Sequence, residues 1–251
     1  MITFILVLLL SYLIGSIPTS IIAGKLTAGI DIREHGSNNA GATNVYRVLG
    51  LGPAIIVAIM DILKGAVAAL LIIRIQIGDP APVSMVMLQL MAGGAAIVGH
   101  IWPIFAKFKG GKGVATTIGV LIGIIPVALA AALTVWLILL FSSRIMSVAS
   151  LGAAVMLPIA TWIWESNPDG AVSQELMVFA LVLCVLIFFT HRANIGRLLR
   201  GEELSLGRSK AGSDKIPPPP AQNAAIPKIT NKVSSGTLSS PPETPVQEDQ
   251  K

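Results

Sequence analysis

The sequence predicts an all-α, polytopic membrane protein, and three observations lead to that fold class. Hydrophobic residues make up 53% of the 251 residues and charged residues only 12%, with a mean hydropathy of +0.77. Such values lie far outside the range of a soluble domain. The apolar residues form long runs separated by short polar breaks, and the basic residues gather in only some of those breaks. Proteins that cross a membrane as helices have this pattern.

Six apolar runs are candidates for membrane spans, because a helix needs roughly 20 residues to cross the hydrocarbon core. The first run has neither a basic region before it nor a small-residue cleavage site, so we expect a retained span and not a signal peptide. The runs are Ile2–Gly24, Pro53–Ile77, Ser84–Phe105, Val114–Phe141, Ile145–Trp164 and Glu175–Thr190.

The fourth run is 28 residues long with Pro126 in its middle, so it could be one kinked helix or two short ones. Basic residues occupy the breaks at 31–47, 106–112, 142–144 and 191–200, whereas "GDPAPV" and "ESNPDG" hold only acids. Lysine and arginine accumulate on the cytoplasmic side. All four basic breaks share that side only if 114–141 crosses twice. We therefore predict seven crossings, two of them short, with the N-terminus outside and the C-terminus in the cytoplasm.

The chain changes character near residue 206. From Gly207 to Lys251 it is rich in proline, serine and threonine and includes the run PPPP, so it cannot bury enough apolar surface to fold. We expect a membrane domain over residues 1–206 and a disordered tail over 207–251. Cys184, the only cysteine, lies in an apolar run and is interpreted as packing.

The break "HGSNNAGATNVYR" (35–47) is richer in hydrogen-bonding residues than a topology loop needs. Glycines let backbone N–H groups converge on an anion, amides and hydroxyls add donors, and Arg47 offers a fork that matches phosphate. The break therefore predicts an oxyanion or phosphate site. Its candidate ligands are Gly36, Ser37, Asn38, Asn39, Gly41, Thr43, Asn44 and Arg47.

The break "KFKGGKG" also combines glycines with basic residues. It precedes a predicted helix whose N-terminus favours an anion. It is not a Walker A loop, because Gly113 stands where that motif has a magnesium-binding Ser or Thr. We expect a phosphate site without a metal or other cofactor. Its candidates are Lys107, Gly110, Gly111, Lys112 and Gly113.

Two more basic breaks belong to the same face. In "HRANIGRLLRGEE", His191 and Asn194 are three residues apart, on one helical face if the span continues. In "SSRIMSVAS", hydroxyl groups flank an arginine. Its candidates are Ser142, Ser143, Arg144 and Ser147.

The three signatures "GSNNAGATNVYR", "GGKG" and "HRANIGRLLRGEE", in this order and separated by spans, resemble those of the bacterial acyl-phosphate:glycerol-3-phosphate acyltransferase family (PlsY). The likeness covers about residues 1–206. It implies an inner-membrane enzyme of phospholipid synthesis with a cytoplasmic site, acting on acyl phosphate and glycerol 3-phosphate within the bilayer, without nucleic acid. The products are lysophosphatidic acid, acylated at sn-1, and phosphate.

The resemblance also assigns residues. It implies that Ser37 and Arg47 are important for activity, that the second-motif glycines with Lys112 form a glycerol 3-phosphate loop, and that Glu203 is structural. The third motif's histidine and asparagine correspond to His191 and Asn194. We therefore expect Ser37, Arg47, Lys112, His191 and Asn194 to be the catalytic set.

Acyl phosphate is a mixed anhydride with a good leaving group, so positioning and charge stabilisation can carry the reaction. The proton of the acceptor hydroxyl could pass to His191 or to the donor phosphate. Direct transfer is preferred over an acylated Ser37, because no adjacent base activates that serine.

A transporter of phosphate or an organic phosphate is the alternative, since broken spans and glycine loops also bind anions there. Transporters tend to place polar groups within spans, whereas this chain collects them at one face. Asp61 and Lys64 are the exception and are interpreted as a structural ion pair. Chain-length preference, oligomeric state and the role of the tail stay open.

Overall fold

The computed structural model describes residues 1–164 and 173–206, and within those ranges every regular element is helical. The predicted tail at 207–251 lies outside the described residues. The α-helices are α1 (Ile2–Gly15), α2 (Thr19–Ala28), α3 (Ala42–Leu49), α4 (Leu51–Leu70), α5 (Met85–Ile101), α6 (Val114–Ile122), α7 (Pro126–Ser143), α8 (Met146–Trp164), α9 (Gln174–Thr190) and α10 (Arg192–Leu199). Short 3₁₀ turns are η1 (Ile32–Glu34), η2 (Ile72–Arg74) and η3 (Ile104–Ala106).

Five segments are long and apolar enough to cross a membrane, and a sixth qualifies if α9 and α10, bent by 59°, count as one. The all-helical membrane fold predicted from the sequence is thereby confirmed. The first predicted span is divided into α1 and α2 at Ser16–Pro18, where proline supplies no backbone N–H to continue α1.

The region 114–143 forms two helices, α6 and α7, with Pro126 at the first residue of α7. Nine residues give α6 a length of about 14 Å, less than half of a hydrocarbon core of roughly 30 Å. By length α6 is a half-length helix and does not add to the five spans, or six with the bent pair α9 and α10, so the predicted seventh crossing is not found among the described residues. The sequence predicted two short helices here, but α7 has 18 residues and only α6 is short.

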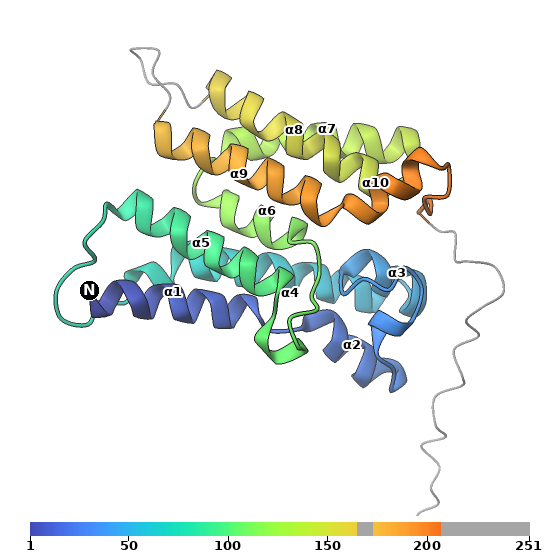
Figure 1. Cartoon of the computed structure of the whole chain (residues 1–251), viewed down its shortest axis with the longest axis horizontal. Helices are drawn as coiled ribbons and strands as arrows, with labels where there is room; N and C mark the ends of the chain where they lie inside the picture. The colour runs from blue at the N-terminus through green and yellow to red at the C-terminus, as the bar shows by residue number, and fades with distance from the viewer. Residues whose placement is uncertain (165–172, 207–251) are drawn as a thin grey trace, which may run out of the picture. The chain divides into compact units, whose positions relative to one another are not determined.

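Two groups of helices enclose the core (Figure 1). Helices α7, α8 and α9 pack together on one side, α1, α4 and α5 lie on the other, and α6 runs between the groups. Glycines allow close contact between α4 and α6, because a Cβ on Gly65 or Gly119 would overlap a backbone carbonyl of the facing helix. Gly119 thus serves an intramolecular contact.

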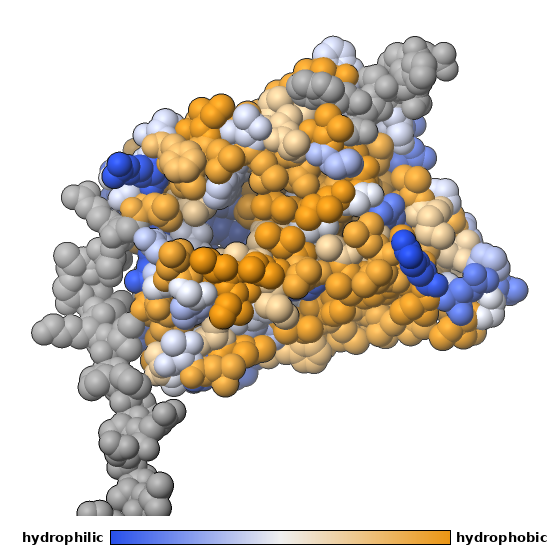
Figure 2. Space-filling view, turned by 180° about the vertical axis from the view of Figure 1, so that it is seen from behind, coloured by the Kyte–Doolittle hydropathy of each residue, from blue (hydrophilic) through white to orange (hydrophobic). Residues whose placement is uncertain are grey.

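The largest apolar cluster joins α5, α6, α7, α8 and α9, with Ile97, Leu121 and Leu183 among its buried residues. Apolar side chains also cover much of the outside. Figure 2 shows them across the broad middle of one face, with hydrophilic side chains toward the two ends. An apolar middle between polar ends suits a protein embedded in a bilayer.

Candidate active site

A cavity of about 550 Å³ gathers the polar breaks that the sequence singled out. It is lined from every helix between α3 and α10, from the loops before α3, α6 and α10 and from the segment after α10. Its polar lining consists of Ser37, Asn38, Asn39, Thr43, Asn44, Arg47, Asp61, His100, Lys112, Ser147, Ser150, Thr190, His191, Arg192, Asn194, Arg197 and Glu203.

One side of the cavity is a loop wall, which we define as residues 36–47. Its organiser is Asn44, whose side chain is fully buried. The amide nitrogen donates to the carbonyls of Ile32 (2.9 Å) and His35 (3.0 Å). The amide oxygen accepts from both the N–H (2.7 Å) and the hydroxyl (3.0 Å) of Ser37. A single neutral side chain therefore fixes the backbone of the loop.

The backbone of the loop wall turns sharply at Gly36 and Asn38, with φ of 61° and 59°. A Cβ on Gly36 would overlap the Asn44 amide oxygen, so only glycine fits there. Asn38 donates its amide to the Arg33 carbonyl at 2.9 Å. Its amide is thus used within the loop, whereas that of Asn39 is free to face a ligand, since it bonds no residue that the structure describes.

Arg47 closes the loop wall from the last turn of α3. One terminal nitrogen, Nη2, donates to the carbonyl of Leu204 at 3.1 Å. The Nε–H is buried and has no partner among the described residues. The guanidinium therefore keeps donors for an anion while it is held to the C-terminal segment.

The opposite side is a charged wall, which we define as Lys112, Ser147, Asn194, Arg197 and Glu203. The Glu203 carboxylate accepts from Asn194 (2.5 Å), Ser147 (2.9 Å) and Arg197 (2.7 Å). Burial alone would raise the pKa of Glu203, but these three hydrogen bonds outweigh it and hold the pKa below its ordinary value. Glu203 is therefore the ionised centre of this wall.

Lys112 reaches the charged wall from the loop before α6. Its ammonium donates to the amide oxygen of Asn194, which orients Asn194 between Lys112 and Glu203. Burial lowers the pKa of Lys112 to about 8, although Glu203 acts in the opposite direction. At neutral pH the wall still presents a cation.

His191 lies between α9 and α10 and is 2% exposed. Its Nδ1 is 2.8 Å from the carbonyl oxygen of Ile187. A carbonyl only accepts, so we infer that Nδ1 carries the hydrogen and that Nε2 is the basic nitrogen of the neutral ring.

Comparisons with known proteins agree with this geometry. The family model described as glycerol-3-phosphate acyltransferase matches residues 5–201. This chain belongs to that family. A glycerol-3-phosphate acyltransferase of Pelodictyon phaeoclathratiforme is 43% identical over 226 residues, which cover 81% of this chain and 96% of the relative. The one of Chlorobaculum tepidum is 42% identical over 230 residues, covering 83% and 99%.

Two solved structures of PlsY (YgiH), an integral membrane glycerol 3-phosphate acyltransferase, share the fold. The glycerol 3-phosphate form has a TM-score of 0.71 and 33% identity, covering 81% of this chain and 96% of that one. The lysophosphatidic acid form has a TM-score of 0.68 and 32% identity, covering 80% and 94%. The acyltransferase described here is therefore an integral membrane protein.

Several predicted ligands of this acyltransferase lie away from the cavity. Ser142 and Ser143 donate to the carbonyls of Ile138 (2.8 Å) and Leu139 (2.6 Å) in their own helix, because a hydroxyl near a helix end readily bonds the preceding turn. The carbonyl of Arg144 accepts from Leu206 at 2.6 Å. The predicted candidates outside the cavity lining are Gly36, Lys107, Gly110, Gly111, Ser142, Ser143 and Arg144.

Other lining residues were not singled out from the sequence. Trp136 stands in an apolar run without any polar pattern to mark it, and Met146 is an apolar residue within the break "SSRIMSVAS". Trp136 also lines an apolar recess of about 40 Å³ between α6, α7, α8 and α9, which shares Val114, Ile118 and Ser150 with the cavity. The cavity thus combines a polar chamber with an apolar extension.

Within the described residues, no cluster of three or more His, Cys, Asp or Glu side chains could hold a metal ion. The polar groups that line the cavity are cations, amides, hydroxyls, imidazoles and carboxylates.

Proposed function

We propose that this chain transfers a fatty acyl group from acyl phosphate to the sn-1 hydroxyl of glycerol 3-phosphate. The observation that carries the proposal is the pairing of two donor-rich walls across one cavity that continues into an apolar recess. Both substrates bring a phosphate, so two anion sites are needed, and the acyl chain needs an apolar surface. Family membership favours acyl transfer over transport.

The phosphates are held by the donors of the two walls. Arg47 with the amide of Asn39 serves one anion, and Lys112 with Arg197 serves the other, in agreement with the cations and donors that line the cavity. Donors fixed before the substrate arrives stabilise charge that develops in the transition state. Asn44 and Glu203 supply that fixation.

In the reaction, the sn-1 oxygen attacks the carbonyl carbon of the acyl phosphate. The carbon–oxygen bond to the phosphate then breaks, so the phosphate leaves with its bridging oxygen and an ester forms. The hydroxyl proton goes either to His191 Nε2 or to the departing phosphate, which can itself accept it. Ser37 is not an acyl carrier, because its hydroxyl points to a neutral amide oxygen and not to a base.

The proposed setting is the inner membrane of a bacterium, with the cavity facing the cytoplasm. The support is that the polar breaks that supply the cavity residues also hold basic residues, as the positive-inside rule requires of cytoplasmic loops. These basic residues are Arg33, Lys107, Lys109 and Arg144.

The test is transfer by purified protein in detergent, with palmitoyl phosphate as donor and labelled glycerol 3-phosphate as acceptor. Palmitoyl coenzyme A and palmitoyl acyl carrier protein are the competing donors. We expect labelled 1-acyl lysophosphatidic acid from acyl phosphate only, and at least about 100-fold less from Arg47→Ala. Transfer from a thioester at an equal rate would refute the proposed donor, and acylation at sn-2 would refute the proposed position.

A further inference from the structure

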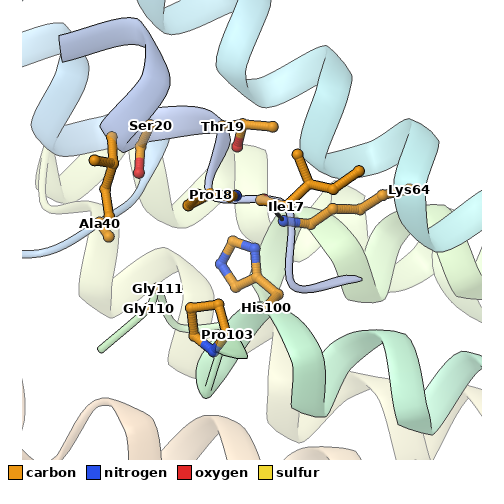
Figure 3. A pocket seen from close by; sticks show the side chains of 11 residues that line it. Ile17, Pro18, Thr19, Ser20, Ala40, Lys64, His100, Pro103, Gly110 and Gly111 are labelled. Atoms are coloured by element: carbon orange, nitrogen blue, oxygen red, sulfur yellow. Dashed lines mark hydrogen bonds between the residues drawn. The ribbon is translucent and has the colours of Figure 1, made fainter. Parts of the chain in front are cut away.

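Beside the main cavity lies a much narrower one of about 10 Å³, beneath the glycine loop 110–113. It has room for only about one water molecule, so it is no substrate site. Figure 3 shows the His100 ring between Pro18 and the strip of chain at Gly110 and Gly111, with the Lys64 side chain reaching toward Ile17.

Asp61 is the centre of the polar contacts around this narrow cavity. Its carboxylate accepts from the Thr19 hydroxyl at 2.6 Å and from the Lys64 ammonium at 2.8 Å. The same oxygen is 3.6 Å from Nδ1 of His100. Asp61 is 2% exposed, and Lys64 and His100 are each 7% exposed. Three helices, α2, α4 and α5, thus meet at one buried carboxylate.

His100 connects that carboxylate to the glycine loop. The His100 carbonyl accepts from the Gly111 N–H at 3.1 Å, and the Ile101 carbonyl accepts from Gly110 at 3.1 Å. A Cβ on Gly111 would overlap Nε2 of the His100 ring, and one on Gly110 would overlap the His100 carbonyl. The two glycines are therefore in direct contact with His100, and Lys112 follows them in the chain.

A purely structural ion pair does not account for this arrangement well. Burying two charges gains little stability, and well-packed apolar residues often replace such a pair without loss. Here the carboxylate faces an imidazole, and both Asp61 and His100 also line the substrate cavity. Nδ1 is buried and has no hydrogen-bond partner among the described residues, so the carboxylate 3.6 Å away is the charge nearest to it and favours the ring form that carries its hydrogen on Nδ1.

We propose that Asp61 and His100 are positioning residues for the acceptor substrate. Asp61 orients the His100 ring, the ring and its carbonyl hold Gly110 and Gly111, and the loop delivers Lys112 to the phosphate of glycerol 3-phosphate. This inference rests on the proposed function in one respect, namely that Lys112 binds the phosphate of glycerol 3-phosphate. It extends the ion-pair interpretation of Asp61 and Lys64 to a role in binding.

The decisive variant is Asp61→Asn combined with Lys64→Met, which removes both charges and leaves neither unpaired. The amide keeps an acceptor for Thr19, so the double variant loses the charge that faces His100 and the hydrogen bond from Lys64 to the Ile17 carbonyl. We expect a melting temperature close to that of the native protein and a Kd for glycerol 3-phosphate raised about tenfold, the effect of one lost charged contact. At saturating glycerol 3-phosphate, kcat should stay within about threefold of native.

A native melting temperature with a native Kd would overturn the proposal, as would a lowered kcat with an unchanged Kd. If the double variant does not fold, Thr19 provides the test with all charges in place. Thr19→Val removes the hydroxyl that holds Asp61, and Thr19→Ser keeps it. We expect Kd to rise about threefold in the first and to be native in the second; a native Kd in Thr19→Val would overturn the proposal.

Thr161→Val is the matched control, because Thr161 is fully buried in α8, bonds the Leu157 carbonyl at 2.8 Å and is not part of the cavity lining. Its Kd should be native. The binding measurement needs no acyl donor. Native protein that binds glycerol 3-phosphate but does not use acyl phosphate would refute the proposed donor alone and leave the positioning test intact.

Discussion

The two walls of the cavity are built by different means. The loop wall takes its shape from Asn44, a neutral side chain that bonds backbone carbonyls, a backbone N–H and one hydroxyl. The charged wall takes its shape from Glu203, an ionised side chain that bonds other side chains. In each wall one acceptor side chain fixes the segment that carries the groups facing the substrates.

Because the two walls are built differently, they should contribute differently to the pH dependence of activity. Backbone N–H groups held by an amide do not titrate, so the loop wall should work equally at every moderate pH. The charged wall depends on protonation, because burial lowers the pKa of Lys112 to about 8. Dependence of activity on pH should therefore come mainly from the charged wall.

The largest effect is expected from breaking the loop wall with Asn44→Ala. The carbonyls of Ile32 and His35 would lose their donor, which should lower the free energy of unfolding by about 2 to 5 kcal/mol. Ser37 would lose its fixed direction, and kcat/KM should fall more than about 100-fold. Thermal unfolding and initial rates check both effects. The control Gln89→Ala removes an exposed amide and should change neither; native activity in Asn44→Ala would show that the wall forms without its organiser.

A smaller loss is expected from Glu203→Gln, which keeps the shape of the charged wall but removes its charge. The new amide can present only one acceptor oxygen where three donors now bond, so Arg197 or Asn194 must turn away. Losing a charged hydrogen bond should reduce kcat/KM by about 10- to 100-fold. Glu202→Gln is the matched control, since Glu202 pairs with Arg200 on the exposed surface. An equal fall of kcat/KM in Glu203→Gln and Glu202→Gln would contradict the role of Glu203 in shaping the charged wall.

The pH dependence gives the next effect. Lys112 is charged below its pKa of about 8 and neutral above it, so kcat/KM for glycerol 3-phosphate should be constant below about pH 7, fall to about half by pH 8 and fall about tenfold by pH 9. Lys112→Arg keeps the charge at all these values. The alkaline fall should therefore disappear in that variant, whatever its absolute rate. A fall that persists would assign the titration to another group.

The smallest effect should come from the apolar recess, which neither wall controls. Ala153 lines it, and Ala153→Leu should fill part of its volume of about 40 Å³. We expect kcat/KM to fall a few-fold for long-chain acyl phosphates and to stay native for short ones. Val155→Leu, at a half-exposed position of the same helix, should leave the ratio of kcat/KM for long-chain to short-chain acyl phosphates unchanged. If Ala153→Leu left the ratio of kcat/KM for long-chain to short-chain acyl phosphates unchanged, the acyl chain would not lie in this recess.

The sequence predicted the fold class and most of the loop wall, because hydropathy sets the spans and the unusual wealth of amides and glycines marks residues 36–47. It could not reveal that Asn44 turns inward to hold the loop while its neighbours face the cavity. It also could not reveal that the hydroxyls of Ser142 and Ser143, predicted ligands, bond carbonyls of their own helix and lie outside the cavity lining.

Contacts between distant segments were the least predictable. Asp61 and His100 are far apart in the chain and no local pattern joins them, and Trp136 carries no signal within its apolar run. The sequence predicted two short helices over 114–141, but only α6 is short, since Pro126 marks a break and not the lengths of the two helices beside it.

The last described residues complete the site. Leu204 accepts from Arg47, Glu203 accepts from Ser147, and the Leu206 N–H donates to the Arg144 carbonyl. These contacts join parts of the chain up to 157 positions apart. During synthesis the helices enter the bilayer one after another, yet neither wall has all its partners until residues 203–206 have left the ribosome. We therefore expect the nascent acyltransferase to be inactive through almost all of its membrane insertion, so that a half-inserted chain does not consume its substrates.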